Sequence, residues 1–433
     1  MTFKFLHAAD IHLDSPLRGL DRYEGAPADE IRCATRRALR NLVDVAVEQG
    51  VAFVVIAGDL YDGDWQDFHT GLFFVQQMNR LREAGIPVVL VSGNHDAANR
   101  MTRALELPTN VRSLSARRPQ TLTGREIGFG LEQIDVVFHG QGFQSATVEE
   151  NVVLSYPPPH SGAFNIGVLH TSLEAAGGEH ARYAPCSVAD LVGRQYDYWA
   201  LGHVHKRQVI RTEPLIAYPG NIQGRHIRES GAKGCLLVSV DDRGKPAAEF
   251  VPLDVFRWFE LPVLVDGAAR GDDVLTRVAD ALSRLVQEHG ELPLAARVLI
   301  HGRCPAHAQL AAAPEQWTQQ VRAVAGNTGG GNVWIEQVKF QTAPVTAADA
   351  RAGDDGPLHE VAQLVNELRG DDQRLGELGR ELESLKRKLP PELLSDALGQ
   401  EPLLPDDLAY LRSALDDVEP LLRARLVPGE GPP

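Results

Sequence analysis

Two histidines two positions apart, His203 and His205 in the segment 201-LGHVHKR-207, are of the residue type and spacing that could bind a metal ion. They follow the run 196-YDYWA-200, whose apolar and aromatic residues are typical of a buried strand. Side chains at positions i and i+2 face the same way only in an extended segment, so both imidazoles could point toward one site. Two histidines do not complete a metal site, and further ligands must come from elsewhere in the chain.

Four other polar clusters also follow apolar runs, at positions where strands are expected to end. They are 9-ADIH-12, 58-GDLYDGD-64, 93-GNHD-96 and 168-VLHTS-172. Each cluster alone is a weak signal, because a D-x-H spacing is common by chance and GNHD also suits a turn. In open α/β sheets, however, functional side chains gather at the carboxyl ends of the strands. The five clusters together therefore favour one site built from several strand ends.

The side chains in these clusters suit a pair of divalent metal ions, which bind carboxylate, imidazole and amide groups. The candidate ligands are Asp10, His12, Asp59, Asn94, His170, His203 and His205. Two ions about 3.5–4 Å apart acidify a water that attacks phosphorus in line, and they leave room for a phosphate. The chemistry that this set suggests is therefore hydrolysis of a phosphate ester.

The elements that must position these residues alternate between strands and helices over the first 250 residues. The predicted strands are 3–9, 51–58, 86–93, 134–140, 165–171, 215–220 and 234–240. The predicted helices, at about 29–49 and 66–84, carry apolar residues at helical spacing. Alternating strands and helices imply a layered α/β fold.

The pattern restarts after residue 254 and predicts a small α+β domain over 255–342. Its Gly-rich segment 326–332 is interpreted as a turn, because it lacks the Lys-Ser/Thr of a phosphate-binding loop. A linker is expected at 343–356, a helical region at 357–426 and a disordered tail at 427–433. The leucine-spaced helices could fold back on the body of the protein or dock onto a partner helix, and the sequence leaves both open.

Composition limits the class of protein. The chain has 433 residues and a formal net charge of −15, and residues 251–433 hold 29 acidic against 18 basic side chains. An acidic balance argues against a general nucleic-acid binder. We expect no membrane span, since no apolar run of about 18 residues occurs. The four scattered cysteines and the absence of a secretory signal pattern indicate a reduced, cytoplasmic protein.

The set of motifs resembles the calcineurin-like metallophosphoesterases, and most of all the SbcD-type DNA repair exonucleases of the YhaO-type branch. The segments that carry the resemblance are 10-DIHLDSPL-17, 58-GDLYDGD-64, 93-GNHD-96, 169-LHTS-172, 201-LGHVHKR-207 and 218-YPGNIQGRHIRE-229. The resemblance implies a layered metallophosphoesterase fold, a β-sandwich flanked by helices, over residues 1–254. It also implies a capping domain at 255–342, and the helical region at 357–426 would then dock an SMC-like coiled-coil ATPase.

The resemblance also implies roles for the candidate residues. One ion would be held by Asp10, His12, Asp59 and His205, and the second by Asp59, Asn94, His170 and His203. Asp59 would bridge the two ions, and His95 would stabilise or protonate the leaving oxygen. The implied metal is manganese, and the implied reaction is hydrolysis of DNA with 3′→5′ polarity. Monomer and homodimer both stay open.

One departure from the family pattern bears on the substrate. Asp62 stands where SbcD-type nucleases often have a histidine, and a carboxylate facing an incoming phosphate would disfavour tight binding of a duplex. The alternative is a phosphodiesterase acting on small or cyclic nucleotides with the same metal centre. A third interpretation is a scaffold subunit whose metal centre is purely structural.

Asp14 and Asp96 are expected to cap loops or support the ligands. Arg225 and its basic neighbours could hold a phosphate or form a solvated loop.

Overall fold

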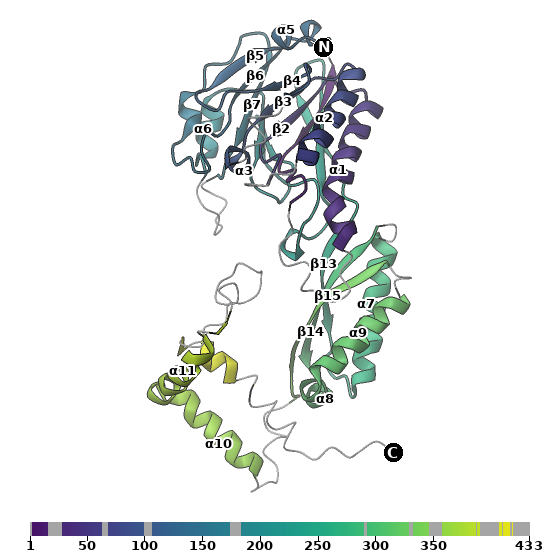
Figure 1. The fold of residues 1–433 in the computed structure, drawn as a ribbon, viewed down its shortest axis with the longest axis vertical. Coiled ribbons are helices and arrows are strands. Elements are labelled where there is room, and N and C mark those ends of the chain that lie inside the picture. Colours follow the sequence, from purple (N-terminus) through teal and green to yellow (C-terminus); the bar gives the residue numbers. More distant parts are fainter. Residues whose placement is uncertain are drawn as a thin grey trace. The chain divides into compact units, whose positions relative to one another are not determined.

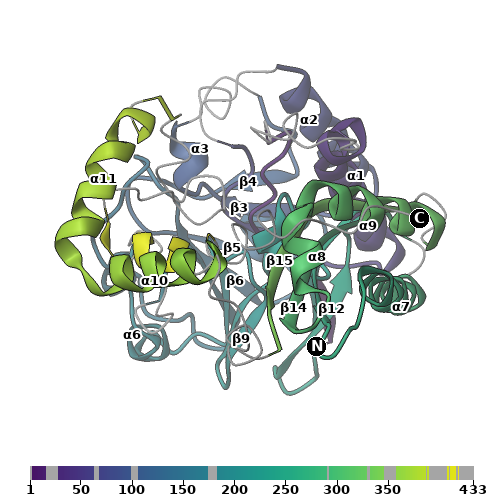
Figure 2. The same cartoon turned by 90° about the horizontal axis from the view of Figure 1, so that it is seen from below.

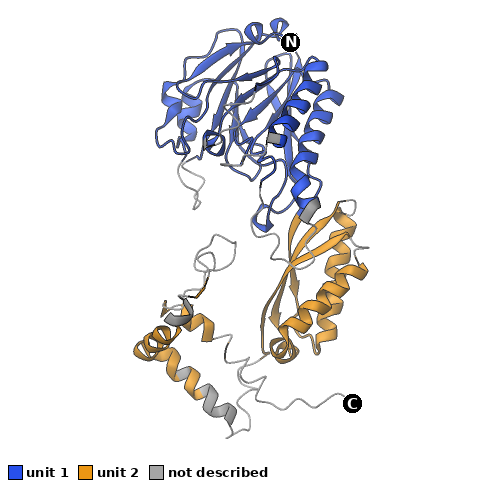
Figure 3. Cartoon of the chain, viewed as in Figure 1, with its two compact units in different colours: residues 1–21, 27–257 blue, residues 22–26, 258–433 orange. Residues whose placement is uncertain are grey.

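The computed structural model of the chain describes residues 2–15, 28–62, 68–98, 106–173, 183–289, 292–328, 332–345, 357–386, 388–389, 407–408, 410–415 and 418. It divides into two compact units (Figure 3): Met1–Asp21 with Pro27–Arg257, and Arg22–Ala26 with Trp258–Pro433. Each unit has a hydrophobic core of its own.

The described part of the first unit contains two six-stranded sheets (Figure 1). The first has the order β12 (Pro246–Pro252), β11 (Gly234–Val240), β1 (Phe3–Ala8), β2 (Phe53–Ala57), β3 (Val88–Val91), β4 (Val111–Ser113). The second has the order β5 (Gln120–Thr123), β6 (Val136–Gln141), β7 (Phe164–His170), β8 (Tyr198–Gly202), β10 (Leu215–Tyr218), β9 (Gln208–Thr212). Strands β1 to β4 are parallel, as are β6, β7, β8 and β10. Parallel strands end at one edge of their sheet, so the side chains that follow them are brought together.

Side chains along the central strands alternate between two buried faces. In β1, Phe5 lies in the core between the two sheets, whereas Leu6 lies in the core on the opposite face. Phe53 of β2 stacks on Phe5 in the inner core, with ring centroids 4.8 Å apart. Burying one such side chain contributes roughly 1.5–3 kcal/mol. Because both faces are buried, these strands appear in the sequence as unbroken apolar runs.

Helices cover the outer face of each sheet. Helices α1 (Ala28–Glu48) and α2 (Phe68–Glu83) pack on the first sheet through residues such as Leu42 and Phe74. Helix α6 (Val188–Gly193) and the turn η3 (Val152–Ser155) pack on the second sheet around Trp199. The shorter elements are α3 (Asn94–Ala98), α5 (Gly124–Ile127), η2 (Leu131–Gln133) and η5 (Ile227–Glu229). The unit is a β-sandwich flanked by helices, which confirms the fold that the family resemblance implied.

Four strands were not predicted from the sequence: β4, β5, β9 and β12. All four lie at the edges of the two sheets. Edge strands are covered by neighbours on one side only, so they need no continuous apolar run. In β9, for example, every side chain is half-buried or exposed. The prediction therefore found the centres of the sheets and missed their borders.

The second unit contains a three-stranded sheet with helices on one side (Figures 1 and 2). The strands are β13 (Arg257–Leu264), β14 (Leu294–Arg303) and β15 (Val333–Ala343), and the helices are α7 (Gly271–His289), α8 (His307–Ala312) and α9 (Pro314–Thr328). Their apolar side chains form one core. The small α+β arrangement matches the sequence prediction, but the predicted turn at 326–332 is partly wrong. Helix α9 continues to Thr328, and 329–331 lie outside the described residues.

Two helices lie in the first part of the predicted helical region 357–426, α10 (Pro357–Gly370) and α11 (Asp372–Lys386). The break between them lies at Asp371, whose carboxylate accepts hydrogen bonds from the backbone N–H groups of Gln373 and Arg374 and so caps α11. In the later part of the predicted helical region, the described residues are 388–389 and parts of 407–418, and the latter are mainly helical. The expected tail at 427–433 lies outside the described residues.

None of the helices in the described ranges combines the length and the apolar character needed to cross a membrane.

Candidate metal centre

The candidate residues come together at the carboxyl ends of strands from both sheets. Asp10 and His12 follow β1, Asp59 follows β2, Asn94 and His95 begin α3 after β3, His170 ends β7, and His203 and His205 follow β8. The sheets stack face to face through a shared core, which brings these strand ends side by side. The structure thus gathers all eight residues at one place in the first unit.

The first group of donor atoms comes from Asp10, His12 and His205, and these atoms lie within 4.8 Å of one another. The Nε2 atoms of His12 and His205 are 3.2 Å apart. His205 Nε2 also lies 3.9 Å from Asp10 Oδ1. Two imidazole nitrogens and a carboxylate oxygen therefore converge on one point.

The second group comes from Asp59, His170 and His203, again with donor atoms within 4.8 Å of one another. His170 Nε2 lies 3.3 Å from Asp59 Oδ2 and 3.0 Å from Asn94 Oδ1. His170 Nδ1 lies 3.0 Å from the carbonyl oxygen of Ala57. A carbonyl can only accept, so Nδ1 carries the hydrogen, and in the neutral imidazole Nε2 presents a lone pair to two oxygen acceptors.

Asp59 lies between the two groups. Its Oδ2 is 3.3 Å from His170 Nε2 in one group and 3.9 Å from His12 Nε2 in the other. Its Oδ1 accepts a hydrogen bond of 3.0 Å from the backbone N–H of His95. A carboxylate in this position can contact ions on both sides, which is what a bridging ligand requires.

The backbone at the centre is held in unusual conformations. Four of the candidates have positive φ angles: Asp10 (52°), His12 (44°), Asp59 (50°) and His203 (97°). For residues other than glycine such conformations cost about 1–3 kcal/mol each, and they tend to cluster at functional sites. Close packing adds a requirement for glycine at position 93, because a Cβ atom there would lie 2.2 Å from Asp59 Oδ1. The strained backbone at these positions orients the candidate side chains toward the centre.

Electrostatics at the centre favour a bound cation. Burial lowers the pKa of His12 to about 3, so this imidazole is neutral and able to act as a ligand. Burial raises the pKa of Asp10, and the nearby carboxylate of Asp59 raises it further. Burial alone would lower the pKa of His170, but Asp59, Asp10 and the carbonyl of Ala57 raise it to about 9. Buried carboxylates and lone pairs in this arrangement attract positive charge, so the donor set fits divalent metal ions.

Glu229 is a site residue that the sequence analysis did not single out. Its Oε1 lies 2.7 Å from Nδ1 of His205, and its side chain is 5% exposed. Burial alone would raise the pKa of Glu229, but Arg225, His205 and His226 lower it well below its ordinary value. The signal in the sequence was an acidic residue inside the segment 218–229, four positions after Arg225, but nothing in the sequence linked it to His205.

His95 is paired with Asp62. His95 Nδ1 lies 2.8 Å from Asp62 Oδ1, and Ser15 Oγ donates a 2.5 Å hydrogen bond to Asp62 Oδ2. Arg225 Nη1 lies 3.6 Å from the same oxygen. The hydrogen bond with Asp62 raises the pKa of His95, whereas burial opposes the rise. The Asp62 carboxylate, which we expected to face the substrate, is instead engaged by these three side chains and by His12, whose Nδ1 lies 3.7 Å from Asp62 Oδ1.

Asp14 and Asp96 hold loops, as predicted. The Asp96 carboxylate accepts hydrogen bonds from the backbone N–H groups of Leu60, Tyr61 and Gly93, which joins the loops after β2 and β3. Burial, with Asp59 nearby, raises the pKa of Asp96 to about 6. Asp14 pairs with Arg36 and accepts from Thr70.

Two histidines outside the candidate set, and the arginine two positions after His205, have structural partners. His7 is fully buried and lies 2.8 Å from the Tyr198 hydroxyl, so it is a core residue. His139 lies 3.1 Å from Asn165 Oδ1 and stacks on Tyr196. The guanidinium of Arg207 lies 3.9 Å from the ring centroid of Phe250, which accounts for one member of the basic pair after His205.

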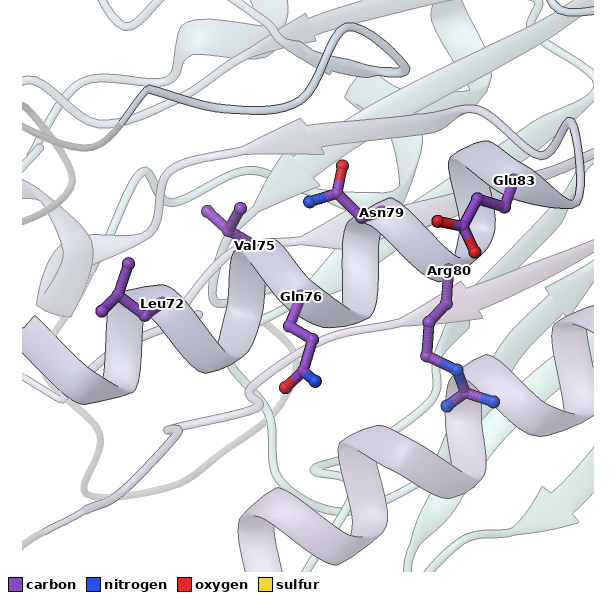
Figure 4. Close-up of a pocket in the computed structure, with 6 residues that line it drawn as sticks. All are labelled: Leu72, Val75, Gln76, Asn79, Arg80 and Glu83. Atoms are coloured by element: carbon purple, nitrogen blue, oxygen red, sulfur yellow. The ribbon is translucent and has the colours of Figure 1, made fainter.

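A surface pocket of about 470 Å³ lies elsewhere in the first unit, along helix α2 (Figure 4). Its lining residues in the described part of the chain are Leu72, Val75, Gln76, Asn79, Arg80 and Glu83. None of these is a candidate ligand, so this hollow is separate from the centre at the strand ends.

Comparison with known proteins agrees with this geometry. Residues 3–207 match the family described as "Calcineurin-like phosphoesterase", and residues 258–343 match "Metallophosphoesterase YhaO, middle domain". The chain is 36% identical over 302 residues to the "Uncharacterized metallophosphoesterase YhaO" of Bacillus subtilis, an alignment that covers 70% of this chain and 72% of that protein.

Two archaeal relatives are more distant. The "DNA double-strand break repair protein Mre11" of Methanopyrus kandleri is 26% identical over 299 residues, covering 63% of this chain and 62% of the relative. The protein of the same name from Archaeoglobus fulgidus is 27% identical over 240 residues, covering 52% of each. The chain thus spans between half and two thirds of the length of these two relatives.

Proposed function

The chain belongs to the calcineurin-like phosphoesterases and carries a YhaO-type middle domain, and from this premise we propose that it hydrolyses phosphodiester bonds in DNA with two bound metal ions. The observation that carries the proposal is the convergence of two groups of donor atoms on either side of Asp59. The family provides the reaction class, phosphoester hydrolysis. The names of the two archaeal relatives support DNA as the substrate.

The ligand assignment follows the two groups of donors. We assign one ion to Asp10, His12, Asp59 and His205, and the other to Asp59, Asn94, His170 and His203. Bound there, the ions would supply Lewis-acid chemistry, which polarises a phosphate and makes water a better nucleophile. Manganese is the metal that the resemblance implies. The protein's own contribution is to fix the ligands at the strand ends and to keep the imidazoles of both groups aimed at the centre.

His95 is the proposed proton donor. Its backbone N–H donates a hydrogen bond to Asp59 Oδ1, which places the residue at the edge of the centre. The Asp62 carboxylate can only accept, so Nδ1 of His95 carries the hydrogen of their 2.8 Å contact. Asp62 also raises the pKa of His95 and so favours the imidazolium form, in which the opposite ring nitrogen, Nε2, carries a hydrogen as well. Nε2 gives this proton to the leaving oxygen as the ester bond breaks, and His95 is left as the neutral imidazole. General acid help of this kind is worth about 10²–10⁴-fold in rate.

The pairing of Asp62 also bears on the substrate. Its negative charge is offset by His95 and by the guanidinium of Arg225. The objection that Asp62 repels an incoming nucleic-acid phosphate is thereby weakened. Within the proposal, the reaction is exonucleolytic with 3′→5′ polarity.

The proposal also includes the domain limits, a partner and a location. We propose that the nuclease domain spans 1–254, the capping domain 255–342 and the linker 343–356. The helical region 357–426 is the proposed docking site for an SMC-like coiled-coil ATPase, and the proposed location is the cytoplasm.

The test is release of nucleotides from linear duplex DNA by the purified full chain with Mn²⁺. We expect release that disappears on chelation and falls by about 10²–10⁴-fold in His95→Ala. The matched control is His301→Ala in the second unit, which should leave the rate unchanged. Failure to release nucleotides, with bis-p-nitrophenyl phosphate still hydrolysed, would overturn the DNA part. Failure on both substrates would overturn the whole proposal.

A second candidate is a phosphodiesterase of small or cyclic nucleotides. The observation that favours it is the number of carboxylates at the centre, Asp10, Asp59, Asp62 and Glu229, which makes it acidic for a nucleic-acid site. Comparison of turnover on cyclic nucleotides and on DNA, at equal Mn²⁺ concentration, distinguishes the two candidates.

A further inference from the structure

The two candidate metal positions differ in how one of their histidines is oriented. His170 Nδ1 donates to a neutral group, the backbone carbonyl of Ala57, at 3.0 Å. His205 Nδ1 lies 2.7 Å from an anionic group, the carboxylate of Glu229. A carboxylate can only accept, so Nδ1 of His205 carries the hydrogen. Its Nε2 then presents a lone pair toward His12 Nε2, 3.2 Å away, and Asp10 Oδ1, 3.9 Å away.

Glu229 is firmly held in this position. Its Oε2 accepts from Asn221 Nδ2 at 2.9 Å and from the backbone N–H of Arg225 at 2.7 Å. Its Oε1 also accepts from Arg225 Nη2 at 3.1 Å. The segment after β10 therefore wraps its own donors around this buried carboxylate. The only ring nitrogen that the carboxylate contacts at hydrogen-bond length among the described residues is that of His205.

The same segment also fixes the backbone of His205. Lys233 Nζ donates to the His205 carbonyl at 3.0 Å. Gly220 lies against the same carbonyl, where a Cβ atom would come within 2.8 Å of the oxygen. The side chain and the main chain of His205 are thus both held by the segment between β10 and β11.

The nature of the outer partner affects how strongly a histidine binds a metal ion. A carboxylate that accepts the second ring hydrogen makes the imidazole a better ligand than a carbonyl does, and loss of such a partner typically weakens metal binding by 10–100-fold. The first position also has a carboxylate of its own, Asp10, where the second has the neutral amide of Asn94. Both differences act in the same direction.

We propose that Glu229 is a positioning residue that orients His205 and makes the position of Asp10, His12 and His205 the tighter of the two metal positions, so that it fills first. This inference rests on the proposed two-metal site, and it assigns a role to a residue outside the proposed ligand set. Glu229 acts through His205 and touches neither the substrate nor the reacting atoms.

The test is a titration of the metal-free full chain with Mn²⁺, followed by the electron paramagnetic resonance signal of the free ion. The wild-type protein should bind two ions with different dissociation constants. In Glu229→Gln the smaller constant should rise by roughly 10–100-fold, while the larger one stays unchanged. The matched control is Glu213→Gln, at an exposed glutamate paired with Lys245, which should titrate like the wild type.

A coupling measurement distinguishes positioning from general damage to the fold. Adding Glu229→Gln to a His205→Gln protein should change the constants by less than about twofold, because the partner through which Glu229 acts is already gone. Adding it to a His170→Gln protein should produce the full shift. An equal shift in both backgrounds would overturn the inference. If Glu229→Gln does not fold, Asn221→Ala, which removes one donor to Glu229, should raise the same constant roughly fivefold; no change in this variant would also overturn the inference.

The outcomes for the inference and for the proposed function are distinct. A wild-type chain that binds two ions, together with a Glu229→Gln variant that binds both equally well, contradicts the role of Glu229 alone. A wild-type chain that binds fewer than two ions contradicts the two-metal proposal, and the inference with it.

Discussion

Two groups of buried charged side chains, one in each unit, differ in how their charges are satisfied. In the second unit, Arg297 of β14 and Glu336 of β15 form two hydrogen bonds of 2.8 and 2.6 Å, with side chains 4% and 2% exposed. A β-bulge in β15 between Ile335 and Gln337 accommodates Glu336 in this pairing. At the strand ends of the first unit, carboxylate oxygens and imidazole nitrogens face one another instead.

The comparison shows that burial of charge does not by itself mark a functional site. The pair in the second unit is balanced, one cation to one anion. The centre in the first unit has an excess of lone pairs, and left-handed backbone at Asp10 and Asp59 keeps them aimed inward. An unbalanced and strained group requires a cation, whereas a balanced pair between neighbouring strands contributes to packing and register.

The largest expected effect comes from removing the shared carboxylate of the centre. Asp59→Asn should reduce phosphodiester hydrolysis by at least about 10⁴-fold. This one change weakens both metal positions and removes several kcal/mol of charge stabilisation from the transition state. Turnover of bis-p-nitrophenyl phosphate with Mn²⁺ measures it. The metal-free protein should unfold at a lower temperature, since the buried imidazole of His170, whose pKa Asp59 raises to about 9, loses its carboxylate partner. A variant with more than a tenth of the wild-type activity would contradict the bridging role.

The next largest effect is expected from replacing the proposed proton donor, His95. This replacement should lower the rate of hydrolysis and leave metal binding unchanged. His95→Gln should lower kcat by about 10³-fold, within the range of general acid catalysis. Its Mn²⁺ titration should match the wild type, because His95 is not an assigned ligand. A large loss of metal affinity with little loss of kcat would assign His95 to the ligand set instead.

The balanced pair should behave in the opposite way to the centre. Glu336→Leu alone should lower the free energy of unfolding by about 3–5 kcal/mol, because it leaves the Arg297 guanidinium buried without this partner. The double change Arg297→Met with Glu336→Leu should restore most of this loss. Urea unfolding of the three proteins measures the difference. Equal destabilisation by the single and double changes would show that the pair is needed for more than charge balance.

The smallest effect is on stability in the presence of metal. At a Mn²⁺ concentration 100 times the dissociation constant, the chain should gain about 2.7 kcal/mol per tightly bound ion, seen as a higher melting temperature. The gain should persist in the Arg297→Met, Glu336→Leu protein and vanish in Asp59→Asn. Loss of the gain in the first of these would mean that the two buried groups are coupled.

Much of the fold followed from local patterns in the sequence. Buried central strands such as β2 are runs of apolar residues, and α1 and α2 have apolar residues at helical spacing, so layers and order could be predicted. The edge strands could not be predicted, because an edge strand is partly exposed and therefore lacks a continuous run of apolar residues. These strands are β4, β5, β9 and β12. The break at Asp371 was also missed, since an aspartate inside a charged helical pattern is not recognised as a cap without its backbone partners.

For the site, the sequence by itself determined the types of donor and their places at strand ends, because each candidate ligand ends or follows a strand whose pattern is local. Tertiary structure alone decided which ring nitrogen of His170 and His205 faces the centre, since that depends on acceptors 113 residues away for His170 and 24 residues away for His205. It also decided that Asp62 meets His95. Contacts of this kind form only when the two sheets stack and the loops at their ends meet. Local sequence patterns do not predict which loops will be in contact.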